Sequence, residues 1–400
     1  MRRSEDMDLS RRALRGRDLV VFSNDWDGDP LSKTHIMRIL ARDNRVLWVN
    51  SIGYRAPKAN AHDAKRIWKK LTTFTQGIRE VEPNLFVLAP LAIPAYGSEA
   101  IRVANRELLK LQVKRAMKKL KFERPVGWSF LPTSAPVSGT LGEDFLVYHC
   151  VDEFSAFSDT NGRHIAELEQ KLMKRADMII TSAERLRANK VKENPNTVLV
   201  RHGTDFRHFV KACDAETVVP ADIANLPRPI LGFFGLVADW VDQDALIACA
   251  KAHAEGSVVI VGKVAPDVDD SKLRAVPNIH LLGRKKYDEL PNYCKAFDVS
   301  LMPFVVNELT LNANPLKVRE YLAAGLPCVS TDLPEVRKVG LCKIASDTED
   351  FVRKVDECLA EGPGPNRERA ERIYSESWDA RVEEIRQHVG AAMLKAGKQL

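Results

Sequence analysis

The chain has 400 residues, 45% of them hydrophobic and 28% charged, which is globular composition and excludes collagen, coiled coil and intrinsic disorder as descriptions of the whole. This length predicts two or three domains rather than one. The net charge is only +6, but residues 58–79 carry +5 and residues 101–124 carry +7, so the remainder sums to −6. A basic sector beside an acidic remainder is typical of a protein that faces something anionic.

The sequence shows no pattern typical of a membrane-spanning segment or a signal peptide. No apolar run approaches the roughly 18 residues that span a bilayer. The first 17 residues are polar and rich in arginine, without the apolar centre of a signal peptide. The seven cysteines are scattered and never form a C-x-x-C pair, so neither a disulfide framework nor a zinc site is indicated. We therefore expect a cytoplasmic protein.

The first half alternates short apolar runs with helical patterns, which is the order of βαβ units. Residues 18–24 form an apolar run typical of a buried parallel strand, residues 31–42 have helical spacing, and residues 45–50 form a second strand. Further strands are expected at residues 85–88, 125–130, 145–150, 177–181 and 197–200, with a long helix over residues 101–121.

The second half restarts the same alternation after residues 226–229. Strands are expected at residues 230–234, 257–261, 278–282, 298–303 and 327–331, and helices at residues 243–253, 288–296 and 315–324. The fold class is therefore α/β, with two Rossmann-like parallel-sheet domains. We predict a basic tail at residues 1–17, a first domain at 18–225, a second at 226–350, and C-terminal helices at 351–400 that can cross back to the first domain.

The sharpest pattern lies around the start of the helix expected at residue 315. Asn314 is a good N-cap, Pro315 suits the first helical position, and Gly325 suits the residue after the helix. A helix that begins at the carboxyl end of a parallel strand offers free N–H groups and a positive dipole to a phosphate. Lys317 can add a full charge, and Glu320 lies on the same helix face, where it can accept both hydroxyls of a ribose. An ordinary cap with a surface Lys–Glu pair explains the spacing equally well.

A carboxylate follows the strand expected at residues 145–150. Asp152 there can act as a general base, and the adjacent Glu153 is an alternative base. The competing interpretation is that Asp152 caps the next turn. His202, before Gly203, can contact a bound ligand, although a structural histidine in a turn fits the sequence as well.

Metal and nucleotide motifs of other enzyme classes are missing. Asp25 and Asp27 have the Asp-x-Asp spacing of a metal site, but solvated loop carboxylates explain so short a pattern better. No cluster has metal-ligand spacing, so no metal and no cofactor is expected. Neither G-x-G-x-x-G nor a P-loop occurs, which argues against dinucleotide enzymes and P-loop ATPases.

Two basic segments could lie on an anionic membrane. The long helix carries Arg102, Arg106, Lys110, Lys114 and Lys118 at a spacing of four, and the segment 64–75 mixes lysines with Trp68. Basic amphipathic segments with aromatic residues bind anionic bilayers. A solvated helix face is the alternative for each segment alone. Nucleic acid is another anionic candidate, but no nucleic-acid motif is present.

The second half resembles the nucleotide-sugar domain of GT-B glycosyltransferases, most of all family 4 and the teichuronic-acid-type enzymes of bacterial surface polysaccharides. The resemblance extends over roughly residues 18–340, and its motifs keep their order and spacing over about 100 residues of the second half. The matching segments are 231–235, 258–263, 278–283, 287–291, 297–304 and 314–327, with residues 147–157 and 201–206 of the first half.

The resemblance implies a fold and a set of roles. It implies a GT-B fold, with two domains facing each other across a cleft, the acceptor in the first and the donor in the second. Glu320 matches the acid that binds the donor ribose, and Lys317 with the amides before Pro315 matches the diphosphate site. The donor-binding set implied in this way is Gly235, Lys263, Arg284, Asn314, Pro315, Leu316, Lys317 and Glu320, with His202 beside it.

Two departures from the family pattern bear on mechanism. Family 4 has two acids eight residues apart, but the position eight before Glu320 is Asn312. The basic pair that follows the first glycine-rich loop in the family is missing from residues 236–240. Both departures weaken the case for a retaining mechanism and tilt the expectation towards inversion with Asp152 as base.

We therefore expect a metal-independent glycosyltransferase that moves a sugar from a UDP-linked donor to a hydroxyl of a lipid-linked or nascent polysaccharide. It would be cytoplasmic and peripheral at the inner face of the plasma membrane, with Trp68, Arg106, Lys110, Lys114 and Lys118 facing acceptor or membrane. Two rivals stay open: an epimerase of the UDP-N-acetylhexosamine type, and a degenerate subunit that binds sugar nucleotide or glycan without turnover.

Overall fold

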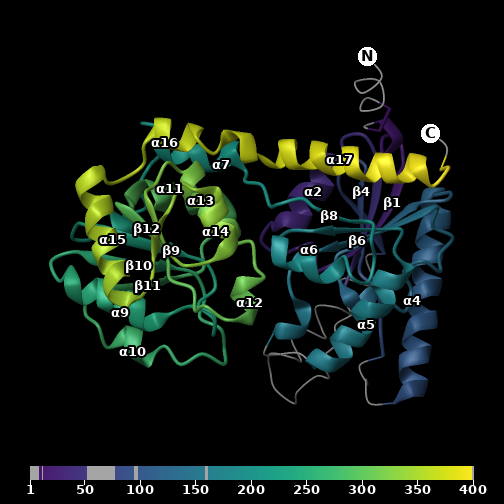
Figure 1. The fold of residues 1–400 in the computed structure, drawn as a ribbon, viewed down its shortest axis with the longest axis horizontal. Helices are drawn as coiled ribbons and strands as arrows, with labels where there is room; N and C mark the ends of the chain where they lie inside the picture. Colours follow the sequence, from purple (N-terminus) through teal and green to yellow (C-terminus); the bar gives the residue numbers. More distant parts are fainter. Residues whose placement is uncertain (1–8, 11, 52–76, 94–97, 158–160, 399–400) are drawn as a thin grey trace. The chain divides into compact units, whose positions relative to one another are not determined.

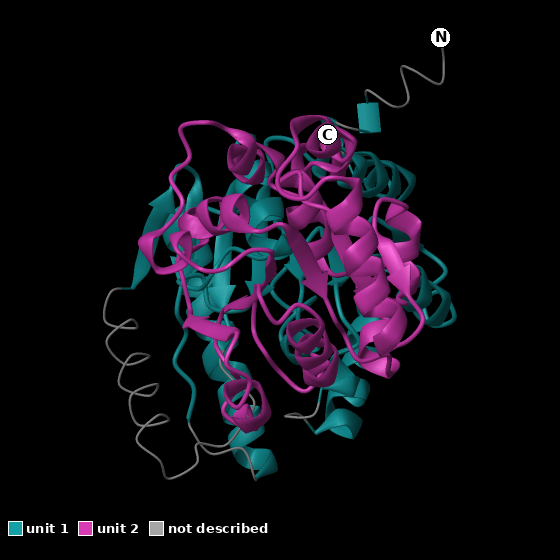
Figure 2. Ribbon diagram, turned by 90° about the vertical axis from the view of Figure 1, so that its left-hand side faces the viewer, with its two compact units in different colours: residues 1–201, 382–400 teal, residues 202–381 magenta. Residues whose placement is uncertain are grey.

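The structure is a computed structural model, and it describes residues 9–10, 12–51, 77–93, 98–157 and 161–398. The chain divides into two compact units, shown in different colours in Figure 2. Unit 1 contains residues 1–201 and 382–400, and unit 2 contains residues 202–381. Each unit is built around one sheet (Figure 1).

The sheet of unit 1 has eight strands in the order β3-β4-β2-β1-β5-β6-β7-β8. Their bounds are Asp18–Ser23 (β1), Arg45–Asn50 (β2), Ile78–Glu82 (β3), Leu85–Leu88 (β4), Val126–Ser129 (β5), Phe145–Cys150 (β6), Met178–Thr181 (β7) and Thr197–Leu199 (β8). All neighbours pair in parallel except β3, an edge strand that is antiparallel to β4 and was not predicted. Its sequence, Ile-Arg-Glu-Val-Glu, has half-buried or exposed side chains, so it lacks the apolar run that marks the other strands.

Helices connect these strands. They are α2 (Ser32–Leu40), α4 (Glu99–Leu120), α5 (Gly162–Arg175) and α6 (Glu184–Lys190), with short 3-10 turns η1 (Pro132–Ser134) and η2 (Phe154–Ala156). The long helix predicted at residues 101–121 is α4, and it buries Leu109, Val113 and Met117 against the sheet. The C-terminal helix α17 (Trp378–Lys395) ends in unit 1, where the buried Arg386 forms an ion pair with Asp43 (2.9 Å).

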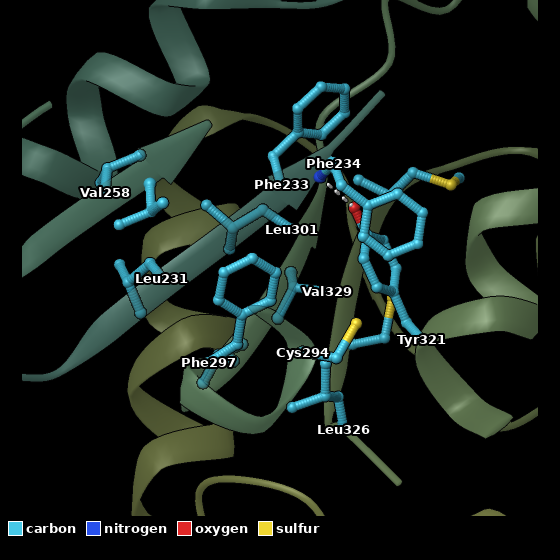
Figure 3. Packing of buried hydrophobic residues seen from close by; sticks show 14 of the residues in the cluster. Leu231, Phe233, Phe234, Val258, Cys294, Phe297, Leu301, Tyr321, Leu326 and Val329 are labelled. Atoms are coloured by element: carbon cyan, nitrogen blue, oxygen red, sulfur yellow. Dashed lines mark hydrogen bonds between the residues drawn. The ribbon is translucent and has the colours of Figure 1, made fainter. Parts of the chain in front are cut away.

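The sheet of unit 2 is entirely parallel, in the order β11-β10-β9-β12-β13-β14. Its strands are Ile230–Phe234 (β9), Ser257–Val261 (β10), Ile279–Gly283 (β11), Val299–Met302 (β12), Cys328–Thr331 (β13) and Lys343–Ala345 (β14). The central strands are continuous apolar runs, as expected for a sheet that is covered on both faces. Figure 3 shows the core, in which Tyr321 Oη accepts the backbone N–H of Phe234 at 2.9 Å. Gly232 lies directly against the ring of Phe297, so a Cβ there would collide with it.

The helices of unit 2 include several short ones outside the predicted set. They are α7 (Phe206–Phe209), η3 (Val210–Cys213), α8 (Ala221–Ala224), α9 (Gln243–Ala252), α10 (Ser271–Arg274), η4 (Tyr287–Glu289), α11 (Leu290–Ala296), α12 (Glu308–Leu311), α13 (Leu316–Ala323), α14 (Pro334–Val339), α15 (Thr348–Glu361), α16 (Arg367–Glu371) and η5 (Tyr374–Glu376). The segment 202–225 differs from the predicted domain boundary, because Phe209 and Ile223 are fully buried in the core of unit 2. The first unit therefore ends at Arg201 rather than near residue 225.

Candidate active site

Two glycine-containing loops are joined at the carboxyl edge of the unit 2 sheet. Gly235 follows β9, and its N–H donates to Val261 O at 2.9 Å. Further along, Val237 forms a parallel bridge with Val264, and its N–H donates to Lys263 O at 2.8 Å. Gly235 has φ +136°, in the region that favours glycine, and a Cβ on Gly262 would collide with its carbonyl oxygen. The backbone of the two loops therefore forms one continuous surface.

Helix α13 begins beside this surface and carries Lys317 across it. A Cβ on Gly235 would collide with Cε of Lys317, so the lysine stem lies directly over that glycine. The Nζ of Lys317 lies 5.7 Å from the centroid of the Phe304 ring, within the range of a cation–π contact. Burial lowers the pKa of Lys317 below its ordinary value, and the charge of Glu320 opposes that change.

Glu320 is half-buried one turn further along α13. Burial raises the pKa of its carboxyl to about 7; Lys317 opposes this increase, and Asp205 at the start of α7 adds to it. Lys317 and Glu320 are therefore neighbours at the edge of the sheet, as their spacing predicts. Asp205 is a neighbour that the sequence analysis did not propose, although an Asp two residues after Gly203 is a recognisable N-cap signal.

The start of α13 differs from the prediction in one respect. The helix begins at Leu316 with the buried Pro315 as N-cap residue, and Asn314 does not cap it with its side chain. Asn314 Oδ1 instead accepts a hydrogen bond from Nη1 of the buried Arg319 (2.6 Å), because a charged buried donor competes for that oxygen. The prediction of Asn314 as N-cap is wrong, whereas Gly325 follows the helix at φ +73° as predicted.

Backbone and side-chain contacts fix Asn314 from two directions. His202 Nδ1 donates to Asn314 O at 2.8 Å, and His202 is 6% exposed. Arg319 also donates from Nε to Glu376 Oε2 at 2.6 Å. His202 therefore touches the loop before α13, and Arg319 is a positioning residue that the sequence analysis missed.

The remaining predicted donor residues lie at the surface of unit 2. Lys263 and Arg284 are exposed, and Leu316 is half-buried in the first turn of α13. The neighbour of Arg284, Lys285, is held by Asp222 (Nζ to Oδ2, 2.6 Å). Lys263 can reach outward from its loop.

Asn312 takes the position of the missing family acid, but it does not face solvent. Its side chain is completely buried, and Nδ2 donates to Glu308 O (2.7 Å) and Glu308 Oε1 (2.8 Å). The acid that contacts Asn312 is therefore Glu308, one helical turn earlier.

In unit 1, Asp152 lies just after β6, and the charge of the buried Lys33 acts on it. Asp152 is half-buried, and burial raises the pKa of its carboxyl to about 6, although the charge of Lys33 opposes the rise. Lys33, in the first turn of α2, is 6% exposed, and its Nζ donates to Asn24 Oδ1 at 2.6 Å. Burial lowers the pKa of Lys33 to about 8, with Asp152 opposing. Lys33 was missed, because a lysine in the first turn of an amphipathic helix gives no signal of its own.

Glu153 is engaged in a buried ionic cluster. Lys190 Nζ donates to Glu153 Oε2 (3.1 Å) and to Glu169 Oε2 (2.8 Å), and Ser155 donates to Glu153 Oε1 (2.7 Å). Tyr148 Oη donates to Glu169 Oε1 at 2.6 Å. Burial alone would lower the pKa of Lys190, but the charges around it raise that pKa. Both carboxylate oxygens of Glu153 already accept hydrogen bonds, so the geometry favours Asp152 over Glu153 as a base.

The basic residues of α4 and the Asp-x-Asp motif at residues 25–27 were also predicted as possible sites. Arg106, Lys114 and Lys118 are exposed on α4 and Lys110 is half-buried, whereas Trp68 lies outside the described residues. Asp27 forms an ion pair with Arg79 (3.0 Å). Among the residues that the structure describes, no group of three His, Cys, Asp or Glu side chains could hold a metal ion. Within the same residues, no helix is both long and apolar enough to cross a membrane.

Comparison with known proteins identifies the type of fold and domain. Residues 228–361 match the family model described as glycosyl transferases group 1. The Bacillus subtilis (strain 168) protein TuaH, named as a teichuronic acid biosynthesis glycosyltransferase, is 25% identical over 231 residues. The match covers 54% of this chain and 58% of that relative.

Solved structures extend the similarity to both units. Sucrose-phosphate synthase from Thermosynechococcus elongatus superposes with a TM-score of 0.67 at 15% identity, over 95% of this chain and 100% of that chain. Anabaena Alr3699/HepE in complex with UDP-glucose gives 0.58 at 13% identity, over 95% and 98%. The expected GT-B fold and the resemblance to teichuronic-acid-type glycosyltransferases are thereby confirmed.

Proposed function

We propose that this GT-B protein, whose second unit carries a glycosyl transferases group 1 domain, is a glycosyltransferase. It transfers a sugar from a UDP-linked donor to a hydroxyl of a lipid-linked or nascent polysaccharide. The observation that carries the proposal is the Lys317–Glu320 pair, which lies at the carboxyl edge of the sheet inside the matched domain, with the Lys317 stem over Gly235.

The donor would bind at the start of α13. The amides before Pro315 and the charge of Lys317 bind the diphosphate, and the carboxylate of Glu320 accepts hydrogen bonds from the ribose hydroxyls. Lys263 and Arg284 approach the donor from the loops after β10 and β11, at the same edge of the sheet. His202 keeps the loop at Asn314 in place. The complex of HepE with UDP-glucose supports uracil as the base of the donor.

Asp152 would act on the acceptor. Its carboxyl has a pKa of about 6, so it is largely ionised at neutral pH and still basic enough to take a proton from the attacking hydroxyl. The reaction then inverts the anomeric centre. The positive charge of Lys33 favours the ionised carboxylate, and no metal or cofactor takes part.

The test is a screen of UDP-, GDP-, TDP- and ADP-sugars by thermal unfolding, since a bound ligand raises the melting temperature. We expect UDP-sugars to stabilise the protein most. Turnover is then followed with and without acceptor. Donor conversion that needs no acceptor would favour the epimerase, and binding without any turnover would favour the non-catalytic subunit.

The basic stripe of α4 would place the enzyme on an anionic membrane at the inner face of the plasma membrane. Replacing Lys110, Lys114 and Lys118 with Gln should reduce cosedimentation with phosphatidylglycerol vesicles, and added salt should do the same for the unmodified protein. Turnover of a short water-soluble acceptor should not change. Salt-independent or absent binding would leave the stripe as a solvated helix face.

A further inference from the structure

A cavity of about 380 Å³ lies in unit 1 between α4 and α5, apart from the residues assigned above to donor and base. Its volume is within the range of small-molecule sites, which is roughly 300–1,000 Å³. Helix α4, the turn after β5, and the start of α5 each contribute to it. The lining residues are Arg102, Asn105, Arg106, Leu109, Thr133, Pro136, Val137, Asn161, His164 and Leu168.

The lining divides into an apolar and a cationic part. Leu109, Val137 and Leu168 are buried and offer only hydrocarbon. Arg102 and Arg106 are exposed one helical turn apart, and Arg106 forms an ion pair with its neighbour Glu107 (2.8 Å). The half-buried His164 belongs to α5. A ligand that satisfies both parts has an anionic head and an apolar chain, because arginine binds phosphate oxygens with two parallel hydrogen bonds and the leucines remove hydrocarbon from water.

Other ligand classes fit this lining less well. None of the ten described lining residues is acidic, so the lining itself offers a cation no counter-charge. His164 is the one aromatic ring among the ten residues, so a nucleobase has no pair of rings to stack between. The side chain of Asn105 is engaged by the backbone of Ile93: Asn105 Nδ2 donates to Ile93 O (3.0 Å), and Ile93 N donates to Asn105 Oδ1 (2.7 Å). These hydrogen bonds compete with any bond to a sugar hydroxyl.

The position of the cavity connects it with the proposed acceptor chemistry. Thr133 lies in η1, which follows the carboxyl end of β5, and His164 lies in the first turn of α5. The loop between β6 and α5 carries Asp152, so base and cavity share one edge of the unit 1 sheet. The basic stripe that begins with Arg102 and Arg106 continues along α4 through Lys110, Lys114 and Lys118, which would draw an anionic lipid surface towards the cavity.

We infer that this cavity binds the phosphate or diphosphate head of a lipid-linked acceptor together with the first part of its apolar chain. Arg102 and Arg106 hold the phosphate oxygens, His164 contributes from α5, and Leu109, Val137 and Leu168 contact the chain. This assignment rests on the proposed transferase function and specifies its acceptor class.

The test uses farnesyl diphosphate as the probe, below its critical micelle concentration, with binding to the full chain measured by calorimetry. Inorganic pyrophosphate and farnesol are the matched probes for head and chain alone. We expect farnesyl diphosphate to bind at least tenfold more tightly than either. Equal affinity for pyrophosphate would reduce the cavity to an anion site, and equal affinity for farnesol would reduce it to an apolar pocket; each result overturns the inference.

Three variants test whether the binding occurs in this cavity. Arg102→Gln with Arg106→Gln should weaken farnesyl diphosphate binding by tenfold or more, since two charge-assisted contacts are lost. Arg115→Gln with Lys119→Gln removes the same charge from exposed positions of α4 outside the cavity, and should change the affinity less than twofold. Thr133→Trp, which fills the cavity, should weaken farnesyl diphosphate more than pyrophosphate. Equal losses in the two double variants would place the binding elsewhere.

Donor binding separates this inference from the proposed function. UDP-glucose affinity is measured in the same variants. If it stays unchanged while lipid binding falls, the cavity is confirmed as an acceptor site; if the parent protein binds no UDP-sugar, the proposed function fails whatever the probe does.

Discussion

Each unit brings a lysine and a half-buried carboxylate together at the carboxyl edge of its sheet, but the two pairs differ in construction. In unit 2, Lys317 and Glu320 share one helix, three residues apart, so local geometry alone makes them neighbours. In unit 1, Lys33 and Asp152 are 119 residues apart and meet only because β1 and β6 belong to the same sheet.

The surroundings of the two carboxylates also differ. Next to Asp152, both oxygens of Glu153 accept hydrogen bonds, one from Lys190 and one from Ser155, so that carboxylate is already engaged. The pKa of Glu320 is raised mainly by burial, and the negative charge of the nearby Asp205 adds to that increase. The arrangement around Asp152 suits a proton acceptor. The arrangement around Glu320 suits a carboxylate that accepts hydrogen bonds from a bound ligand.

The largest effect should come from Asp152→Asn, which keeps the shape of the side chain and removes the base. Turnover should fall by about 10²–10⁴-fold, whereas the affinity for UDP-glucose stays nearly constant. Glu153→Gln should reduce turnover much less. NMR of the first product should show inverted anomeric configuration; the donor's own configuration would remove the base role from Asp152.

The next effect concerns the ionic cluster behind Asp152. Lys190→Met leaves Glu153 and Glu169 without their counter-charge in a buried site, which should lower the free energy of unfolding by about 3–5 kcal/mol. Lys192→Met, at an exposed position two residues away, is the control and should change it by less than about 0.5 kcal/mol. Chemical denaturation measures both. Equal stabilities would mean that the cluster does not fix the loop of Asp152.

At the donor site, Glu320→Ala should weaken UDP-glucose binding by about 1.5–3 kcal/mol, because a charge-assisted hydrogen bond is lost. Glu349→Ala, an exposed glutamate in the first turn of α15, should have no effect. Lys317→Ala should weaken UDP more than uridine in calorimetry. Equal losses of affinity for UDP and uridine would show that Lys317 does not contact the diphosphate.

The smallest and broadest effect is on pH dependence. A raised carboxyl pKa means that the ionised, hydrogen-bond-accepting form is reached only at higher pH. UDP-glucose affinity should therefore rise as the pH increases through about 7, where Glu320 ionises, and turnover at saturating donor should rise through about 6, where Asp152 ionises. In Glu320→Gln the step in affinity near pH 7 should vanish. A step that persists in that variant would belong to another group.

The sequence determined whatever is encoded locally. The apolar runs of β9 and β10 gave their bounds residue for residue, since a strand covered on both faces is apolar throughout. The Lys317–Glu320 pair and Gly325 after α13 followed from helical spacing and from the positive φ that glycine tolerates. Together with the family motifs, these features were enough to identify a GT-B fold.

Only the tertiary structure decided the features that depend on distant residues. Periodicity could not show that Lys33 lies near Asp152, that Lys190 occupies Glu153, or that Arg319 takes the side chain of Asn314 away from the helix cap. Nor could it show that Phe209 and Ile223 are buried in the second core, which moves the boundary of the first unit from near residue 225 to Arg201. Burial and long-range charge pairing arise when the sheets assemble, and no local pattern in the chain records them.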